Sequence, residues 1–396
     1  MNKIEKLLNE LCPNGVEFKS LGEVCEVVTD YVAAGSFKDL SKNVTYLKEP
    51  DYAQLVRTTD IKNKFKKGDF IYVDKKAFEY LWRVNLNKET IVLPNIGNCG
   101  EVYYITPKDL PYPRNVLATN ALVVRSLKQN NKFLSYLFQC DFFQKQLKKI
   151  TSDAGQGKFN KTDLKTLKIP IPPLEIQEEI VKILDTFTEL EAELEAELEA
   201  RRRQYEYYRN KLLSFEYLKT NGGGYELKML GEVCEIANGR DYKYLNSGDI
   251  PVYGAGGKML CVDNFLYEGE SVCIGRKGTI DKPFYLNEKF WAVDTLFFTK
   301  NFKNYIIPKF LFYIFTYIDW KQYNQSLARP SLTKAILEKI QIPIPSLEVQ
   351  EKIVSILDQF HALTTDLQSG IPAEIEARKK QYEYYRNQLL TFKETI

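Results

Sequence analysis

The chain has 396 residues, of which 44% are hydrophobic and 27% charged, and its formal net charge is +3. This length favours two domains over a single core, and the composition excludes a disordered or collagen-like chain. No apolar run reaches the ~18 residues of a membrane span, and the charged N-terminal segment does not resemble a signal peptide. The seven cysteines are dispersed, without a C-x-x-C pair, as is typical of the reducing cytosol. We therefore expect a cytoplasmic protein without a membrane partner.

The single histidine limits the chemistry further. With His361 alone, a zinc site of several histidines is impossible, and this residue would have to serve any histidine-dependent catalysis. It lies in the leucine-rich stretch LDQFHALTTDL, which favours a structural role. A phosphate-binding loop of the form G-x-x-x-x-G-K-[ST] and a strand followed by G-x-G are both missing. These observations predict a binding protein without catalytic residues or a metal site.

Residues 1–166 are expected to form the first domain. Short runs of Val, Ile, Tyr and Phe, such as DFIYV and EVYYI, predict strands, and the Gly, Asn, Asp and Pro residues between them predict turns. An apolar segment near residues 133–150 predicts helical structure. The first domain is therefore expected to be of mixed α+β type, with its variable part over residues 16–166.

Residues 167–216 are expected to form the first long helix. Pro172 and Pro173 lie just before its start, where proline is tolerated. Its apolar and aromatic positions, with one arginine among them, take ten steps from Ile180 to Phe215, a mean spacing of about 3.5 residues, which is the period of a coiled-coil seam. Two independent core helices would explain the amphipathic pattern but not the length. The run ELEAELEAELEA at residues 189–200 is expected to be a solvated, salt-bridged surface.

The same succession follows a second time, as an α+β domain over residues 217–339 and a helix over residues 340–396. KIPIPPLEIQEEIVKILDTF returns as QIPIPSLEVQEKIVSILDQF, ARRRQYEYYRNKLLSF as ARKKQYEYYRNQLLTF, and LGEVCE and KFLSYLF have counterparts too. The second helix carries four additional residues near 368–372, where Gly370 and Pro372 should bend or interrupt it. A scaffold that repeats faithfully and carries variable inserts suits recognition modules on a common frame.

The charge is unevenly divided between the two kinds of segment. The two helices sum to −7, and the rest of the chain carries +10. The variable blocks therefore carry an excess of positive charge, which is the sign of charge that a polyphosphate partner requires. Two similar modules held apart by a rod are suited to contact two separated short stretches of DNA.

Candidate base-reading residues lie on glycine-containing turns, where a backbone approaches a ligand closely and where Arg, Lys, Asn or Gln can contact base edges. Ordinary turn chemistry is the alternative explanation for each of them. The candidates are Arg57, Thr58, Asn95, Asn98, Gln156, Lys158 and Asn160 in the first block, and Asn238, Arg240, Tyr242, Lys258, Arg276, Lys277 and Arg329 in the second.

At this point the sequence resembles the specificity subunits of type I restriction–modification enzymes. The resemblance is carried by LGEVCE at the opening of each block, by the PIP-[PS]-LE-[IV]-Q entry to each helix, and by the QYEYYRN segment near its end. GDIPVYGAGGK, GESVCIGRKGTIDKPFYL and FWAVDTLFF in the second block belong to it as well. It covers essentially the whole chain.

The resemblance implies a fold and a division of labour. The fold would be α+β, with two mixed target-recognition domains separated by two long helices that form an antiparallel coiled coil, and with an internal pseudo-two-fold repeat. Each domain would read one half of a split asymmetric sequence in double-stranded DNA. Two methyltransferase (modification) subunits would dock on the helical regions, and restriction subunits would join them. Candidate interface residues there are Tyr205, Tyr208, Arg209, Tyr382, Tyr385 and Arg386.

The chain itself would be a non-catalytic subunit without a bound cofactor. S-adenosylmethionine, ATP and Mg are then expected on the partner subunits. Two other classes stay open from the residues alone. A self-contained nuclease or methyltransferase would need a carboxylate cluster or a donor loop that the sequence does not offer. A coiled-coil assembly scaffold without sequence-specific DNA reading would explain the helices, but it leaves two basic α+β blocks without a role.

Overall fold

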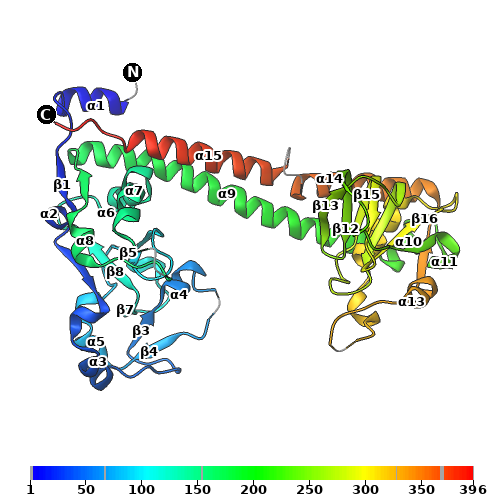
Figure 1. Ribbon diagram of the computed structural model, residues 1–396, viewed down its shortest axis with the longest axis horizontal. Coiled ribbons are helices and arrows are strands. Elements are labelled where there is room, and N and C mark those ends of the chain that lie inside the picture. The colour runs from blue at the N-terminus through cyan, green and yellow to red at the C-terminus, as the bar shows by residue number, and fades with distance from the viewer. Residues whose placement is uncertain (1–2, 67, 153–154, 327, 366–369, 396) are drawn as a thin grey trace. The chain divides into compact units, whose positions relative to one another are not determined.

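The computed structural model describes residues 3–66, 68–152, 155–326, 328–365 and 370–395. Its contacts divide the chain into unit 1, Met1–Ala192 with Glu376–Ile396, and unit 2, Glu193–Ile375. Two helices, α9 (Leu174–Leu212) and α15 (Ile371–Leu389), have residues in both units (Figure 1). Each unit has its own sheets and its own hydrophobic core.

Unit 1 contains three sheets. The orders are β2-β8-β5-β6, which is antiparallel throughout, β4-β3-β7, in which β3 and β7 are parallel, and the pair β1-β9. Besides α9 and α15, its elements are α1 (Lys3–Leu11), β1 (Phe18–Ser20), α2 (Leu21–Val24), β2 (Val27–Asp30), η1 (Tyr31–Ala34), α3 (Phe37–Asn43), β3 (Ala53–Val56), α4 (Thr58–Lys62), β4 (Ile71–Val73), α5 (Lys75–Tyr80), η2 (Trp82–Val84), β5 (Thr90–Pro94), β6 (Tyr103–Ile105), η3 (Pro107–Asp109), β7 (Asn115–Leu117), β8 (Ala121–Arg125), α6 (Asn131–Gln139), α7 (Asp141–Ile150), α8 (Lys161–Thr166) and β9 (Lys168–Pro170).

The four-stranded sheet of unit 1 is covered on both faces. Successive side chains of a strand point to opposite faces, so Ile91 and Leu93 of β5 join the core that contains α6 and the first turns of α9. Val92, between them, joins the core around β3 and β7. Because both faces are buried, the strand reads TIVLP without polar alternation. Burial on both faces thereby fixes the end of β5, from which the next loop begins.

Unit 2 is built on one six-stranded sheet of order β11-β16-β14-β15-β12-β13, in which β12 and β15 are parallel. A separate pair joins β10 to β17. Besides α9 and α15, its elements are α10 (Phe215–Thr220), β10 (Glu226–Met229), α11 (Leu230–Val233), β11 (Glu235–Asn238), β12 (Ser247–Gly254), β13 (Gly257–Val262), β14 (Tyr267–Gly275), β15 (Phe284–Ala292), β16 (Leu296–Lys300), α12 (Pro308–Tyr317), η4 (Trp320–Tyr323), α13 (Lys334–Lys339), β17 (Gln341–Ile344) and α14 (Leu347–Thr365).

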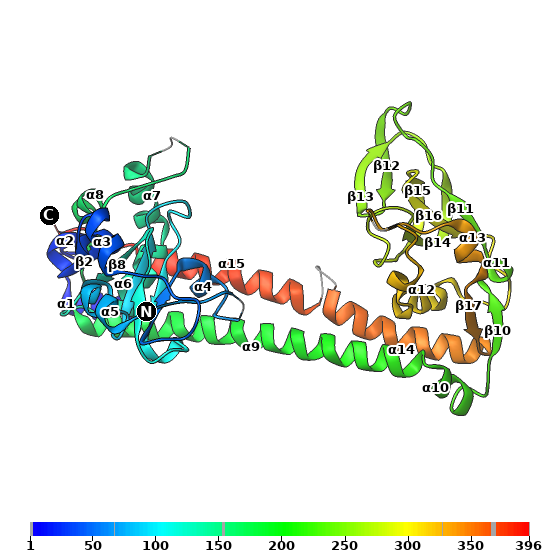
Figure 2. The same ribbon diagram turned by 90° about the horizontal axis from the view of Figure 1, so that it is seen from below.

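Helix α12 is the centre of the unit 2 core and packs on both β14 and α14 (Figure 2). Val272 and Ile274 of β14 point toward it, whereas Cys273 points to the opposite face of the sheet. Ile353 and Leu357 of α14 complete the same core. The sheet is therefore tied to α14 through one apolar helix.

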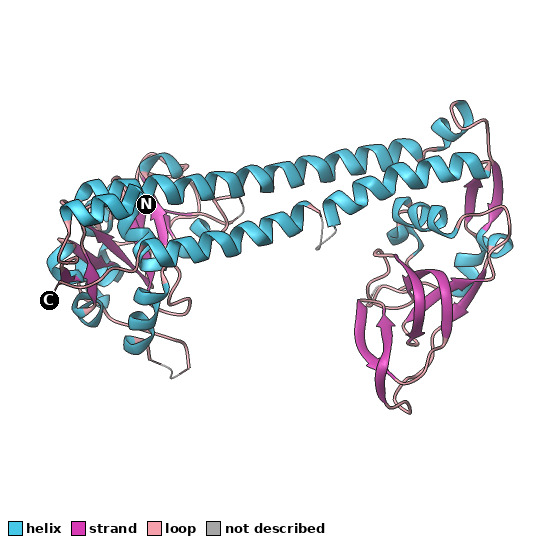
Figure 3. Ribbon diagram, turned by 90° about the horizontal axis from the view of Figure 1, so that it is seen from above, coloured by secondary structure: helices cyan, strands magenta, loops and turns pink. Residues whose placement is uncertain are grey.

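The repeated LGEVC segments occupy equivalent places in the two units. Each forms a one-turn helix, α2 or α11, which follows a short strand that pairs with the strand preceding a long helix (Figure 3). A Cβ atom at Gly22 would lie 3.0 Å from Cβ of Lys165, and one at Gly231 would lie 3.2 Å from Cβ of Glu338. The short helix thus packs closely on α8 or α13, and a larger residue at either glycine would displace the neighbouring side chain.

Long helices pair in an antiparallel sense within unit 1. The ring of Phe187 in α9 stacks on Tyr385 of α15 with centroids 5.5 Å apart. One turn further along α9, Glu191 forms an ion pair of 3.3 Å with Lys379. As the residue numbers of the contacting positions increase along α9, those of their partners in α15 decrease. The two helices therefore run in opposite directions there.

The same sense holds within unit 2. Tyr205 of α9 lies 6.3 Å from the ring of His361 in α14, and Tyr208 stacks on Phe360 at 5.3 Å. His361 is half-buried, and burial lowers its pKa. This is the structural environment that the sequence predicted for the single histidine. The two α+β units, their paired helices and their repeated connections confirm the expected fold class.

Two details differ from the periodicity argument. Helix α9 ends at Leu212, and Phe215, expected in the seam, instead begins α10, because the side chain of Ser214 accepts a hydrogen bond from the amide of Tyr217 and caps that helix. Leu190 and Leu363 are 41% and 44% exposed. These two leucines are therefore less buried between the helices than the spacing predicts.

Gly370, where an interruption of the second long helix was expected, lies in a bend and not in a helix. Helix α14 ends at Thr365 and α15 begins at Ile371. Gly370 precedes α15 and Pro372 lies in its first turn, where its missing amide proton costs no helical hydrogen bond. The first part of the predicted insertion, at Gln368, lies outside the described residues.

Candidate nucleic-acid interface

In unit 1, two segments that are about sixty residues apart in the sequence pair with each other. A bridge joins Ile96 to Lys158, and the amide of Gly97 donates to the carbonyl of Gly157 at 2.9 Å. Gly97 has φ of +86°, and a Cβ there would lie 2.9 Å from Nε2 of a glutamine in the facing segment. The structure thus brings together four of the predicted residues, Asn95, Asn98, Gln156 and Lys158.

These four residues are not equally available. Asn95 is partly buried, and its Nδ2 donates to the carbonyl of Phe159 at 3.3 Å. Asn98, Gln156 and Lys158 are exposed. Asn95 therefore holds the two segments together. Gln156 and Lys158 present amide and ammonium groups to solvent, and the exposed side chain of Asn98 also hydrogen-bonds Glu101.

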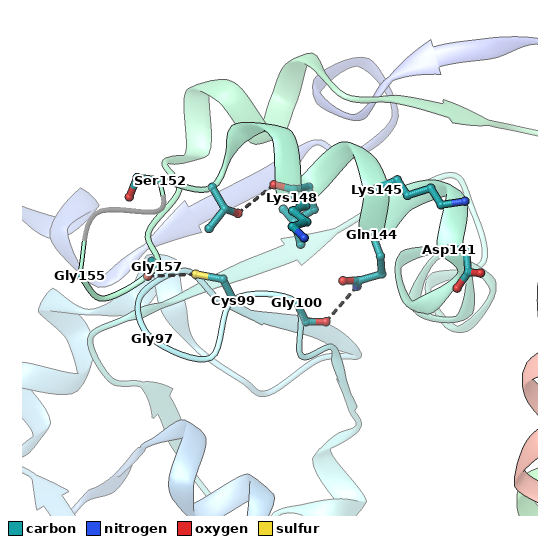
Figure 4. A pocket seen from close by; sticks show the side chains of 12 residues that line it. Gly97, Cys99, Gly100, Asp141, Gln144, Lys145, Lys148, Ser152, Gly155 and Gly157 are labelled. Carbon is teal, nitrogen blue, oxygen red and sulfur yellow. Dashed lines mark hydrogen bonds between the residues drawn. The ribbon is translucent and has the colours of Figure 1, made fainter.

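Helix α7 completes this edge of unit 1. Nε2 of Gln144 donates to the carbonyl of Gly100 at 2.9 Å, which ties the helix to the first segment (Figure 4). Figure 4 shows Lys145 and Lys148 beside this contact; they help to line a cavity of about 680 Å³, which Asp141 also lines. Both lysines are exposed. Sequence reasoning missed them, although their spacing of three residues places them on one face of a helix.

The side chain of Arg57 is engaged within the chain. The guanidinium of Arg57 donates to both carboxylate oxygens of Asp60, at 3.0 and 2.6 Å, and to the carbonyl of Asp69 at 3.1 Å. Asp60 is 2% exposed, and its hydrogen bond raises the pKa of Arg57. Thr58 begins α4. The forked face of Arg57, which would pair with a guanine, is already occupied within the chain.

Asn160 also acts locally. Its side-chain oxygen accepts from the amide of Asp163 at 2.8 Å, and its Nδ2 donates to the carboxylate of the same residue at 2.7 Å. Asn160 is therefore the N-cap of α8, the position for which asparagine is among the preferred residues.

In unit 2, the turn after β14 pairs with the segment before α13. The carbonyl of Arg276 accepts from the amide of Leu332 at 2.9 Å, and a bridge joins Lys277 to Ser331. A Cβ on Gly278 would lie 3.3 Å from Nη2 of Arg329. Three predicted cations, Arg276, Lys277 and Arg329, are therefore neighbours on two paired segments.

Arg276 is also tied to the turn between β15 and β16. Its amide donates to the carbonyl of Thr295 at 2.8 Å, and its guanidinium carbon lies 5.9 Å from the ring centre of Phe297. Nη1 lies 3.5 Å from the carbonyl of Asp294. The side chain is half-exposed, so much of its hydrogen-bonding capacity faces solvent.

Arg240 reaches the same turn from the other side. Its amide donates to the carbonyl of Ala292 at 2.8 Å, and its carbonyl accepts from Nε1 of Trp291 at 3.0 Å, which leaves the guanidinium exposed. A Cβ on the preceding Gly239 would lie only 2.0 Å from the carbonyl oxygen of Val293. Glycine thus permits the close approach that places Arg240 here; Asn238, at the end of β11, is exposed beside it.

Lys258 comes from the hairpin between β12 and β13. It lies opposite Tyr253, whose carbonyl accepts from the amide of Val293 at 2.9 Å. A Cβ on Gly275 would lie 3.1 Å from Cβ of Ala255 in the hairpin turn. The hairpin therefore flanks the two turns that carry the arginines, and the ammonium of Lys258 is exposed.

Tyr242 differs from its neighbours because it packs against a small core. That core consists of Val252, Val262, Trp291 and Val293. The ring is half-buried. Tyr242 therefore supports the turn that carries Arg240. Lys282, which sequence reasoning missed, is exposed and helps to line a cavity beside the hairpin turn.

The helix residues predicted at a subunit interface make ring contacts inside the chain. Tyr205 and Tyr382 are half-buried, and burial raises the pKa of each phenol. Arg209 and Arg386 lie over these rings, at 5.7 and 5.3 Å from the centroids. Tyr208 and Tyr385 stack across the helix pairs described above. Tyr207 and Tyr384 are the most exposed aromatic residues of the repeated QYEYYRN segments, at 59% and 57%, and Tyr385 is 38% exposed.

Among the residues that the structure describes, no group of three or more His, Cys, Asp or Glu side chains could hold a metal ion. Within the same residues, no helix has the length and apolar character required to cross a membrane.

The type I restriction modification DNA specificity domain matches the chain twice, over residues 13–200 and 223–377. A putative type I specificity subunit of Mycoplasma pneumoniae is 36% identical over 241 residues, which cover 58% of this chain and 98% of that protein. The specificity subunit of a type I restriction enzyme of Escherichia coli is 31% identical over 317 residues, which cover 68% and 74%.

Two solved structures share the fold over nearly the full length. The type I restriction-modification system S subunit from M. genitalium has a TM-score of 0.56 and 18% identity, covering 95% of this chain and 96% of that one. A chain from a structure on complex assembly and conformational transition of the type I R-M system has a TM-score of 0.63 and 18% identity, covering 96% and 98%. Through the two matched segments, the chain belongs to the type I restriction modification DNA specificity family.

Proposed function

We propose that this chain directs a type I restriction–modification complex to its DNA sites, with units 1 and 2 each reading one half of a split asymmetric sequence. One observation carries the proposal beyond family membership. In unit 2, exposed or half-exposed cations from four separate segments converge around one turn, namely Arg240, Lys258, Arg276, Lys277 and Arg329. Phosphate contacts by such cations supply affinity, and bidentate arginine contacts to guanine supply specificity.

Unit 1 supports the same role with different side chains. Asn98 and Gln156 can make paired contacts to adenine, while Lys145, Lys148 and Lys158 suit phosphates. The two edges thus differ in the residues that would face bases. This difference is what two unlike half-sites require.

Catalysis would belong to the partner subunits. Methyltransferase subunits would bring S-adenosylmethionine, and restriction subunits would bring ATP and Mg. We assign docking of the two methyltransferase subunits to the surfaces around Tyr207 and Tyr384, because exposed aromatic side chains are enriched at protein interfaces. The surfaces are equivalent in the repeat, so two copies of one partner could use them.

A block exchange tests the proposal. Residues 16–166 are replaced by the corresponding block of another family member, and methylated sites of the reconstituted complex are sequenced. One half of the target should change, and the other half should stay the same. The reciprocal exchange of residues 225–339 is the matched control and should change the other half. Simultaneous change of both halves in either hybrid would contradict separate reading by the two units.

A further inference from the structure

A fully buried glutamine joins the recognition part of unit 2 to its long helix. Gln350, on the first turn of α14, is 0% exposed. Its Oε1 accepts from the amide of Ile307 at 2.9 Å, and its Nε2 donates to the carbonyls of Tyr305 and Pro345, both at 2.9 Å. Ile307 immediately precedes α12. The buried carboxamide therefore fixes the start of α12 against the start of α14, since any shift would leave polar groups unpaired.

A carboxylate makes a second attachment about two turns along the same helix. Asp358 accepts from the hydroxyl of Tyr313 and forms an ion pair of 2.8 Å with Lys309. Both partners lie on α12, four residues apart and hence on one face. Two polar attachments at separate points along α12 define the direction of this helix on α14. Apolar packing alone would specify that direction less strictly.

Unit 1 repeats the arrangement. Gln177 is 0% exposed; its Oε1 accepts from the amide of Asn130 at 3.0 Å, and its Nε2 donates to the carbonyl of Pro172 at 2.7 Å. Asp185 accepts from the hydroxyl of Tyr136 at 2.5 Å and from Nζ of Lys132 at 2.7 Å. These residues occupy the same positions of the two sequence repeats as their counterparts in unit 2.

Each attached helix packs on a strand that leads to a candidate reading edge. In unit 2 this name denotes the candidates around Arg276, and in unit 1 those around Asn98 and Gln156. Helix α12 packs on β14, which ends at Gly275, directly before Arg276. Helix α6 packs on β5, which ends at Pro94, directly before Asn95. The path from the long helix to the reading turn therefore crosses one helix and one strand in each unit.

We infer that Gln177 with Asp185, and Gln350 with Asp358, are positioning residues that set the orientation of each reading edge on its long helix, and thereby the permitted gap between the two half-sites. The inference rests on the proposed function. Base preference would be unaffected, because none of the four residues lies on a reading edge. The apolar contacts of Ile180 and Leu184, and of Ile353 and Leu357, remain to hold the fold when a carboxylate is removed.

The test uses the reconstituted methyltransferase complex and a DNA library in which the two half-sites are separated by gaps of varying length. In Asp358→Ala, the preference for the native gap over gaps one base pair longer or shorter should fall at least fivefold, with unchanged half-site bases. Asp185→Ala should act alike. Asp358→Asn retains an acceptor for the Tyr313 hydroxyl and should restore most of the preference, which a loss of general stability would not predict.

The matched controls are Glu178→Gln and Glu351→Gln, which remove exposed carboxylates at equivalent positions of α9 and α14 and should keep the native preference. If Asp358→Ala does not assemble, Tyr313→Phe removes only the hydroxyl and should relax the gap in the same direction. An unchanged gap preference in an active Asp358→Ala or Tyr313→Phe complex overturns the inference. Failure of the unsubstituted complex to methylate any two-part site would instead refute the proposed function.

Discussion

At the scale of single residues, the two arginines Arg276 and Arg57 show how context decides availability. Both come directly after a strand, Arg57 as the N-cap of α4 and Arg276 at the start of a turn. The guanidinium of Arg57 is held by the buried carboxylate of Asp60, whereas Arg276 makes only a long contact to a carbonyl and lies near an aromatic ring. Arg276 therefore keeps donors for a DNA base or phosphate.

Replacing Arg276 and Lys277 together by alanine should weaken DNA binding by the complex. A bidentate base contact contributes about 1–3 kcal/mol of discrimination, so the half-site read by unit 2 should also become less selective if Arg276 contacts a guanine. Fluorescence anisotropy across a salt series, with methylation mapping, measures both effects. Lys303→Ala, beyond the opposite end of β16, is the control and should bind normally. Equal affinity and an unchanged methylation pattern in the double variant would remove this turn from the interface.

The sequence could identify the glycine-containing turns, but not which of their polar residues were already engaged. Asn160 and Gln156 are both exposed and stand on the same segment, yet the side chain of Asn160 is engaged in capping α8. The difference depends on where a helix begins, to within one residue. Lys145 and Lys148 were missed for a related reason: the bridge between Ile96 and Lys158, with the hydrogen bond of Gln144 to Gly100, brings α7 to the reading edge.

At the scale of elements, the long helices contribute to both cores. Helix α9 contributes Ile180 and Leu184 to the core of unit 1 and its last residue, Leu212, to that of unit 2, which Leu213 joins directly after the helix. Helix α14 starts in the core of unit 2, and Leu390, directly after α15, lies in that of unit 1. Periodicity predicted the helices, but their ends depend on caps such as Ser214, whose contribution a spacing argument does not include.

Leu390→Ala should therefore destabilise unit 1, although this residue is more than two hundred positions from most of the core that it joins. Leu390 is 1% exposed, and truncation of a buried leucine costs about 2–5 kcal/mol. Hydrogen exchange should show faster exchange in the strands of unit 1 and unchanged protection in those of unit 2. Leu213→Ala, its counterpart in the repeat and 0% exposed, should do the reverse. Equal loss of protection in both units would contradict separate cores.

At the scale of the whole molecule, α9 is one helix of 39 residues that contains the run ELEAELEAELEA. The leucines of this run recur every four residues, so a further LEAE unit preserves their succession. Four residues add about 6 Å of helix at 1.5 Å per residue, whereas one base pair advances about 3.4 Å along DNA.

Inserting one LEAE unit within residues 189–200 should lengthen the unspecified gap of the target by one or two base pairs. The half-site sequences should stay the same, because no residue of either reading edge is changed. Sequencing the methylated sites of the lengthened variant measures the gap. A folded and active complex with an unaltered gap would show that the run is only a solvated surface.

The most direct test of the account maps methylated DNA positions across a genome in cells that carry the partner subunits, with and without this chain. We predict that one asymmetric two-part sequence, with an unspecified gap of fixed length, is methylated only when the chain is present. Methylation of the same sequence in the absence of the chain, or of a single uninterrupted sequence in its presence, would contradict the claim that its two units direct the complex to DNA.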